Sequence, residues 1–260
     1  MLNRAQIKAE AKMIMKGARV SPYIMTLLVL VILFILDRVT DLVQGGSPFY
    51  SYGMVERYMD ILESGNLGAL EEMTALLPVN IGAGLFFSIL VSLAGIILNG
   101  GYYIYCMGVR RGAEMPYATL ADGLGSAGKL IWCGILMYIK IFLWSLLFWI
   151  PGIIAAYRYR FAYYNILTDA SLSAGGAIQL SCQQTRGMKG DLFVLDLSFF
   201  GWMLLSSITF GLLDIWLTPY MTLCDLAYFE EGQRRVGRGY FNDRQGNHMP
   251  PMDGDPWGPI

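Results

Sequence analysis

The stretch PYIMTLLVLVILFIL, residues 22–36, carries no charged side chain and is followed at once by Asp37 and Arg38. With the next few residues it approaches the roughly 20 residues that a helix needs to cross a bilayer. It lacks the small-residue cleavage pattern of a secretory signal, so we expect it to be retained as a signal anchor. The first apolar segment therefore indicates a membrane protein.

The composition of the whole chain favours the same class. Of the 260 residues, 55% are hydrophobic and 15% are charged, and the mean hydropathy is +0.46. Soluble domains carry about 25% charged residues, so the deficit is large. The formal net charge of -1 argues against a nucleic-acid partner. The four cysteines are far apart and form no CxxC pair, which argues against a disulfide framework or a metal site.

We expect an all-α fold, namely a polytopic membrane helix bundle with six transmembrane helices and short amphipathic surface helices. The spans of this membrane domain, residues 21–231, are predicted at 22–39, 80–104, 130–149, 152–168, 192–210 and 212–229. Pro151 and Gly152 predict a tight turn between the third and fourth spans, with Pro151 at the first position of the next helix. Whether 152–168 crosses fully or is re-entrant is left open by the pattern.

The segments outside the spans have distinct predicted roles. The external loop, residues 40–78, has apolar positions at helical spacing that fit two surface helices. Residues 232–260 are rich in Gly, Pro and Arg and are predicted to be a disordered cytoplasmic tail.

Residues 1–20 are predicted to form a basic amphipathic helix. Asn3 and Gln6 have the spacing of a capping box, and Lys8, Lys12 and Lys16 recur every fourth residue beside an apolar face. Such a helix suits the surface of an anionic leaflet, so we expect these lysines to contact anionic lipid headgroups of the lipid bilayer. A solvated helix that only precedes the first span fits the pattern equally well.

The positive charges fall on alternating sides of the predicted spans. They gather in the N-terminal arm, in the second and fourth connections and at the start of the tail. The long first loop holds only Arg38 and Arg57 as basic residues, among seven acidic ones. Because Lys and Arg mark the cytoplasmic side, we predict a multi-pass protein of the cell membrane with both termini in the cytoplasm.

Several ionisable residues are predicted to lie at membrane depth, where each costs about 2.5–3.5 kcal/mol to insert and is a functional candidate by default. This candidate intramembrane polar core comprises Lys140, Arg158, Arg160, Asp196 and Asp225. Counting about 1.5 Å per residue from the turns near Pro151 and Gly211 places Asp196 and Asp225 at similar depth, nearly within reach of Arg160. In one interpretation these three residues line a path for an ion or small solute. In the other, which we favour, they form a structural salt bridge and Lys140 snorkels outward.

The sequence offers no catalytic constellation. A paired-aspartate hydrolase needs two carboxylates that share a proton, but Asp196 and Asp225 lack a Gly-x-Gly-Asp context, and Arg160 would hold both ionised. The only histidine, His248, lies in the predicted tail, and no metal-ligand cluster is present. We therefore predict no enzyme activity, no cofactor and no metal.

Several segments together resemble a bacterial integral membrane family catalogued as domain of unknown function 975. They are KAEAKMIMKG (8–17), GVRRGAEMPYATLADG (108–123), FLWSLLFWIPGIIAAYRYRFAYYNIL (142–167), MKGDLFVLDLSFFGW (188–202) and LTPYMTLCDLAYFEE (217–231). One departure is Asp191, where a basic or polar residue is expected. The family has no established activity, so the resemblance implies a bacterial membrane protein and supplies no mechanism or site. The pattern is also similar to the membrane domain of some glycerophosphodiester phosphodiesterases, which implies association with lipid or a partner protein.

We expect a non-enzymatic scaffold or accessory component of a membrane or envelope system, acting with a membrane-protein partner of unknown identity. The basic arm, the basic tail and the missing catalytic constellation motivate this hypothesis. The alternative is a small-solute or ion permease whose polar core surrounds Arg160, Asp196 and Asp225. The sequence shows no inverted repeat and no pair of Gly-broken helices, features typical of transporters.

Overall fold

The computed structural model describes residues 3–43, 59–61, 63–64 and 81–237, in which all regular secondary structure is helical. This confirms the predicted all-α class for the described part of the chain. The main elements are α1 (Arg4–Gly17), α2 (Pro22–Val43), α5 (Ile81–Arg110), the 3-10 helix η1 (Tyr117–Ser126), α6 (Ala127–Leu147), α7 (Trp149–Tyr159), α8 (Ala162–Thr168), α9 (Ala174–Gln184), α10 (Lys189–Ile208) and α11 (Asp214–Arg235).

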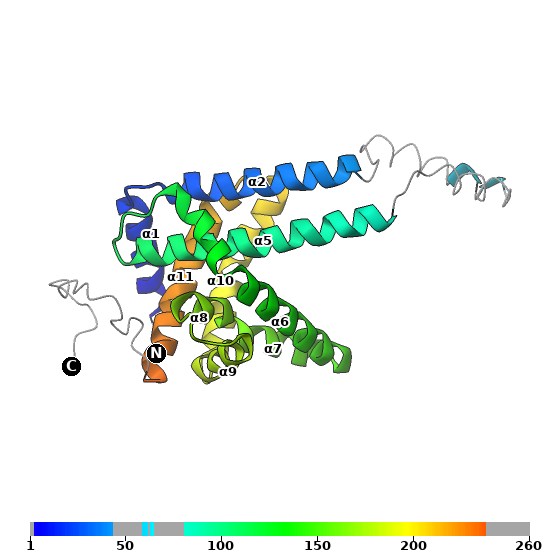
Figure 1. The fold of residues 1–260 in the computed structure, drawn as a ribbon. Helices are drawn as coiled ribbons and strands as arrows, with labels where there is room; N and C mark the ends of the chain where they lie inside the picture. The colour runs from blue at the N-terminus through cyan, green and yellow to red at the C-terminus, as the bar shows by residue number, and fades with distance from the viewer. Residues whose placement is uncertain (1–2, 44–58, 62, 65–80, 238–260) are drawn as a thin grey trace.

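Two helix pairs and one helix with contacts to many elements, α11, make up most of the fold (Figure 1). The first pair is α2 and α5. The two helices run antiparallel, as their contacts show: Thr26 bonds to Tyr102, and Leu33, farther along α2, contacts Gly95, which lies earlier in α5. The second pair is α6 and α7. Helix α11 contacts α1, α2, α5, α9 and α10, and twelve of its residues are buried. The larger of the two buried hydrophobic clusters therefore surrounds α11, and the second lies among α6, α7, α8 and α9.

Four stretches are long and apolar enough to cross a membrane, judged by length and composition. They are Pro22–Asp41, Phe86–Arg110, Tyr117–Leu146, which includes η1 and α6, and Lys189–Ile208. The predicted count of six is therefore not confirmed. The predicted sixth span lies in α11, which carries several charged residues, namely Asp214, Asp225, Glu230, Glu231, Arg234 and Arg235.

The predicted fourth span, 152–168, is not one continuous helix. The structure divides it at Arg160 and Phe161 into α7 and α8, of 11 and 7 residues. Either piece alone is much shorter than the roughly 20 residues of a membrane-spanning helix. The sequence left open whether this segment crosses fully, and no Gly or Pro marks the break, which a side chain of α9 stabilises.

The turn that precedes α7 also lies earlier than predicted. Helix α6 ends at Leu147, Phe148 is extended with φ -164 and ψ 153, and α7 begins at Trp149. Pro151 is therefore the third residue of α7 and not its first, a position that still needs no intrahelical N–H donor. The turn at Gly211 lies where it was predicted, with φ +82.

Other boundaries differ from their predictions by a few residues. Helix α2 continues to Val43, and α11 continues to Arg235, into segments predicted as loop and tail. The predicted surface helices of the loop 40–78 and the tail from residue 238 lie outside the described residues, apart from short helical turns at 59–61 and 63–64.

The predicted N-terminal helix is present as α1, and the Asn3 side chain caps it by accepting a hydrogen bond from the Ala5 amide at 3.1 Å. Its apolar face, formed by Ile7, Ala11 and Met15, is buried within the protein core, and α1 contacts α11. The apolar face of this helix is thus occupied by protein and is not available to a bilayer.

Helix η1 packs very closely on α5, because both contribute glycine at the contact. A Cβ atom on Gly101 would lie 2.2 Å from the Leu120 carbonyl oxygen, and one on Gly123 would lie 2.3 Å from the Ile97 carbonyl oxygen. Both obstacles are backbone atoms, which cannot rotate away. This contact fixes where α6 begins, because η1 leads directly into α6.

We predict that Gly101→Ala destabilises the protein by about 1–3 kcal/mol, because the added methyl group must push η1 away from α5. The matched control is Gly128→Ala, where a Cβ has open space in α6 and the substitution should be neutral or slightly stabilising. Thermal unfolding in detergent measures both. Equal melting temperatures for the two variants would contradict the close η1–α5 contact.

Candidate functional site

The candidate site begins at the break between α7 and α8, which Ser181 of α9 stabilises. Its hydroxyl donates to the Arg158 carbonyl oxygen at 2.8 Å and accepts from the Phe161 amide at 3.1 Å. A helix interruption leaves backbone donors and acceptors without intrahelical partners, and Ser181 supplies one of each. The break places Arg160 between the two short helices, with its side chain directed to α10 and α11.

Arg160 binds two carboxylates at once. Its Nη1 and Nη2 donate to Asp196 Oδ2 and Oδ1 at 2.6 and 2.8 Å. Its Nη2 donates to both Asp225 oxygens, Oδ1 at 2.8 Å and Oδ2 at 2.9 Å, and its Nε donates to Asp225 Oδ2 at 3.2 Å. Bidentate pairs of this kind combine charge with a fixed orientation. The depth argument from the sequence thus paired the correct three residues, which we call the Arg160 cluster.

Tyr157 extends the Arg160 cluster on its α7 side. Its hydroxyl donates to Asp196 Oδ2 at 2.8 Å, and the Arg160 guanidinium lies 5.6 Å from the centre of its ring. The side chains of Arg160, Asp196 and Asp225 are 19%, 24% and 16% exposed, so water or lipid has only limited access. One arginine and two aspartates give the cluster a formal charge of -1, spread over three helical segments.

The other two predicted members of the polar core lie apart from this cluster. Arg158 contributes its backbone carbonyl to Ser181, and the Lys140 ammonium lies 5.9 Å from the centre of the Tyr159 ring. The turn at Phe148 explains the position of Lys140. Lys140 is 8 residues before Phe148 and Arg160 is 12 after it, a difference of about 6 Å in depth.

A second buried arginine, Arg110, is the last residue of α5 and belongs to the basic residues of the second connection, which served above only to predict the topology. Its Nε and Nη2 donate to Glu230 at 2.7 and 3.0 Å, and Nη2 also donates to Glu10 at 3.0 Å. Its side chain is only 6% exposed. Arg110 therefore joins the end of α5 to α1 and α11. The sequence signal that could have found it is a charge directly after a long charge-free stretch, with acidic residues in the flanking helices.

Three amide side chains form a buried cluster between α8, α9 and α11. Asn165 and Gln184 exchange two hydrogen bonds of 3.0 and 2.8 Å, and Gln233 donates to Asn165 Oδ1 at 3.3 Å. Each of the three residues is at most 4% exposed. The sequence did not predict this cluster, because Gln233 was placed in the tail.

The lysines of α1 have different surroundings. The Lys8 ammonium donates to Ser198 Oγ of α10 at 2.7 Å and lies 4.4 Å from the centre of the Phe199 ring. Burial lowers the pKa of Lys8, as do the neighbouring charges of Lys12 and Arg4 to a lesser extent. The Lys12 ammonium lies 5.6 Å from the Tyr220 ring centre but is exposed, as is Lys16. Contact of these lysines with anionic headgroups stays a prediction.

Within the described residues, no group of three or more His, Cys, Asp or Glu side chains has the arrangement of a metal site. In the Arg160 cluster, both carboxylates are engaged by the same guanidinium. The arrangement is suited to holding helices in a fixed relation, because each partner compensates the charge of another in a partly buried setting.

Residues 146–235 match a protein family described as "Protein of unknown function (DUF975)". The matched segment contains α7 to α11 and hence the whole Arg160 cluster, and it confirms the family resemblance over these residues. No curated protein and no solved structure matches the chain.

We predict that Arg160→Ala lowers the stability in detergent by about 3 kcal/mol, because it leaves two carboxylates without their partner. Adding Asp196→Asn and Asp225→Asn to this variant should recover part of the loss. Lys140→Ala is the control and should have a small effect, since Lys140 lies outside the cluster. The measurement is thermal unfolding, and a silent Arg160→Ala variant would contradict a structural role for the cluster.

Proposed function

We propose that this protein, whose residues 146–235 carry a domain of unknown function 975, is a non-enzymatic integral protein of the cell membrane. In this proposal it acts as a scaffold or accessory component for a membrane or envelope system. One observation carries the proposal: the outer faces of α2, α5, α6 and α10 are apolar, whereas Arg110 and Arg160 in the interior are paired with acidic side chains.

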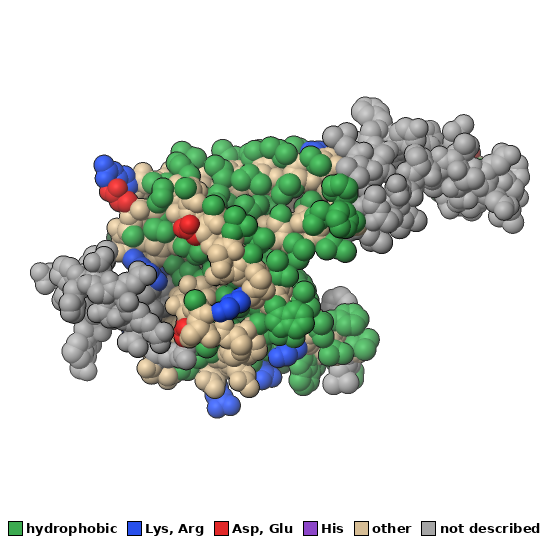
Figure 2. Space-filling view, in the orientation of Figure 1, with side chains coloured by type: hydrophobic (Ala, Val, Ile, Leu, Met, Phe, Trp, Pro, Cys, Tyr) green, Lys and Arg blue, Asp and Glu red, His purple; other side chains and the backbone are tan. Residues whose placement is uncertain are grey.

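The apolar outer surface supports insertion in a bilayer. Large hydrophobic side chains are exposed along α2, α6 and α10, among them Phe34, Phe142 and Phe200. Figure 2 shows hydrophobic side chains covering the face formed by α2 and α5, with charged ones mainly toward its edges. Monomeric soluble proteins rarely expose apolar patches larger than a few hundred Å2, so lipid or a partner must cover this surface.

The paired interior charges support a structural role over chemistry. A general acid or base needs a group that is free to exchange a proton with a substrate. Asp196 and Asp225 are instead both bound to Arg160, and Glu10 and Glu230 are both bound to Arg110. Fixed ion pairs hold a rigid platform, which is what a scaffold requires. The permease alternative would need the Arg160 cluster to open during transport.

The proposal includes a topology with both termini in the cytoplasm. Four and six spans are both even numbers, so either count leaves the two ends on the same side. Single cysteines introduced as Ser64→Cys and Gly246→Cys, in a background lacking the four native cysteines, should react differently with an impermeant maleimide added to intact cells. We expect labelling at position 64 and none at 246 until the cells are permeabilised. Labelling of both positions from outside would refute this topology.

The scaffold role predicts a partner that is recovered with the protein. Affinity purification from native membranes should yield a second protein in a fixed ratio, and the pure protein in liposomes should not change the flux of ions or small solutes. The triple variant Arg160→Ala, Asp196→Asn, Asp225→Asn provides the control: a permease would lose flux in this variant, whereas a scaffold has none to lose. A protein recovered alone that conducts a solute would overturn the scaffold proposal in favour of the permease.

A further inference from the structure

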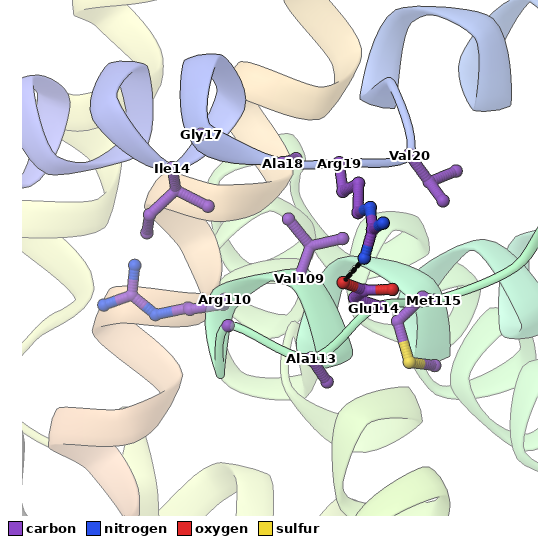
Figure 3. A pocket seen from close by; sticks show the side chains of 11 residues that line it. Ile14, Gly17, Ala18, Arg19, Val20, Val109, Arg110, Ala113, Glu114 and Met115 are labelled. Atoms are coloured by element: carbon purple, nitrogen blue, oxygen red, sulfur yellow. Dashed lines mark hydrogen bonds and ion pairs between the residues drawn. The ribbon is translucent and has the colours of Figure 1, made fainter.

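Two cavities follow one another along α5. The outer one has a volume of about 580 Å3 and lies between the α1–α2 connection and the end of α5, where Arg19 and Val20 face Val109, Glu114 and Met115 (Figure 3). Near its inner end, the Tyr105 hydroxyl donates to the Val20 carbonyl oxygen at 2.8 Å, which holds the α1–α2 connection against α5.

The inner cavity is an apolar groove of about 470 Å3. Its lining comes from three elements: Ile32 and neighbouring leucines of α2, Ala94 and Ile97 of α5, and Ala121 and Leu124 of η1. The only side-chain polar atom among the lining residues is the Tyr117 hydroxyl. Leu28 and Leu36 both line the groove and lie eight residues apart on α2. The groove therefore extends about 12 Å parallel to this helix.

The packing of η1 places the two cavities in line. Met115 covers Gly108, and Leu120 covers Gly101, so the chain from 115 to 120 runs back along α5 toward its middle. Met115 lines the outer cavity, and Tyr117 lines the inner one. A cavity that holds the charged side chains Arg19, Arg110 and Glu114 at the end of α5 is thus followed by an apolar groove beside the middle of the same helix.

The outer cavity carries one exposed charge of each sign. Arg19 and Glu114 form an ion pair across it, with side chains 77% and 63% exposed, and Figure 3 shows them directed toward each other. An ion pair this exposed contributes little to stability, so either partner can exchange the other for a charge on a ligand. A ligand that carries both a phosphate and an ammonium group would satisfy both residues.

We propose that these cavities bind one diacyl phospholipid with a zwitterionic headgroup of the phosphoethanolamine type. One acyl chain lies in the inner groove, the phosphate contacts Arg19, and the ammonium group contacts Glu114. The inference rests on the membrane insertion proposed above, because the groove then opens into the hydrocarbon layer, where acyl chains are the abundant apolar species. Charge complementarity at the outer cavity distinguishes this occupant from a partner helix.

The test titrates dioleoylphosphatidylethanolamine into the delipidated protein in detergent and counts bound lipids by native mass spectrometry. We expect one site that is occupied before all others. Ile32→Trp and Ala121→Trp fill the groove from two different elements, α2 and η1, and should each weaken this site about tenfold. The control is Ile35→Trp, the same change on the same helix at a residue that is 54% exposed and does not line the groove, and it should bind as the wild type does. Ala121 is exposed, so its replacement tests the groove even if Ile32→Trp fails to fold.

The headgroup is tested with two further variants and two further probes. Arg19→Gln should weaken the site severalfold, and Glu114→Gln should abolish the preference for phosphatidylethanolamine over phosphatidylglycerol. Inorganic phosphate alone should not compete. If the groove variants and the Ile35→Trp control bind the lipid equally, the lipid only coats the apolar surface of the protein, and the inference is overturned. Competition by phosphate alone, or a wild-type preference for phosphatidylglycerol, would overturn it as well.

Carbonate extraction of native membranes separates this inference from the proposed function. A wild-type protein released by carbonate would contradict membrane insertion itself. A protein that resists extraction but shows no site-specific lipid would contradict only the lipid site.

Discussion

A guanidinium held between two carboxylates is the interaction on which the C-terminal half of this protein depends. Arg160, Asp196 and Asp225 come from the α7–α8 break, α10 and α11, and no two of them belong to the same helix. In a partly buried setting, removing one member leaves a charge that neither water nor protein compensates. The relative positions of these three segments are therefore coupled: none can move far without separating charges.

Helix α11 carries this coupling through the rest of the molecule. Its Asp225 pairs with Arg160, its Glu230 pairs with Arg110, and its Gln233 bonds to Asn165. These polar residues connect α11 to the α7–α8 break, α5 and α8 in turn, while Tyr228 and Phe229 between them are fully buried. The least apolar of the long helices is thus the most central one. This placement makes physical sense because its charges need protein partners, whereas α2, α5, α6 and α10 can turn apolar faces outward.

The break between α7 and α8 links an interruption of the backbone to the placement of the Arg160 side chain. Ser181 replaces the lost helical hydrogen bonds at Arg158 and Phe161, so the interruption leaves no orphaned backbone group at these two positions. The break directs Arg160 away from the helix path and toward two acidic residues. The lipid groove proposed beside α5 lies at another part of the molecule, between elements that meet through glycine contacts and not through charges.

The sequence by itself determined the helical class, the apolar segments, the cap at Asn3, the turn at Gly211 and the approach of both aspartates to nearly within reach of Arg160. All of these follow from local chemistry or from counting along a helix of fixed rise, which needs no tertiary information. Only the tertiary structure decided the break at Arg160, the turn at Phe148, the burial of α1 and the Arg110 pairs. The break depends on Ser181 of α9, and the Arg110 pairs depend on Glu10 of α1 and Glu230 of α11, all of them distant in sequence. Hydrophobic periodicity indicates which residues are buried, but it does not indicate which residues contact one another, because contacts between helices are set by packing in three dimensions.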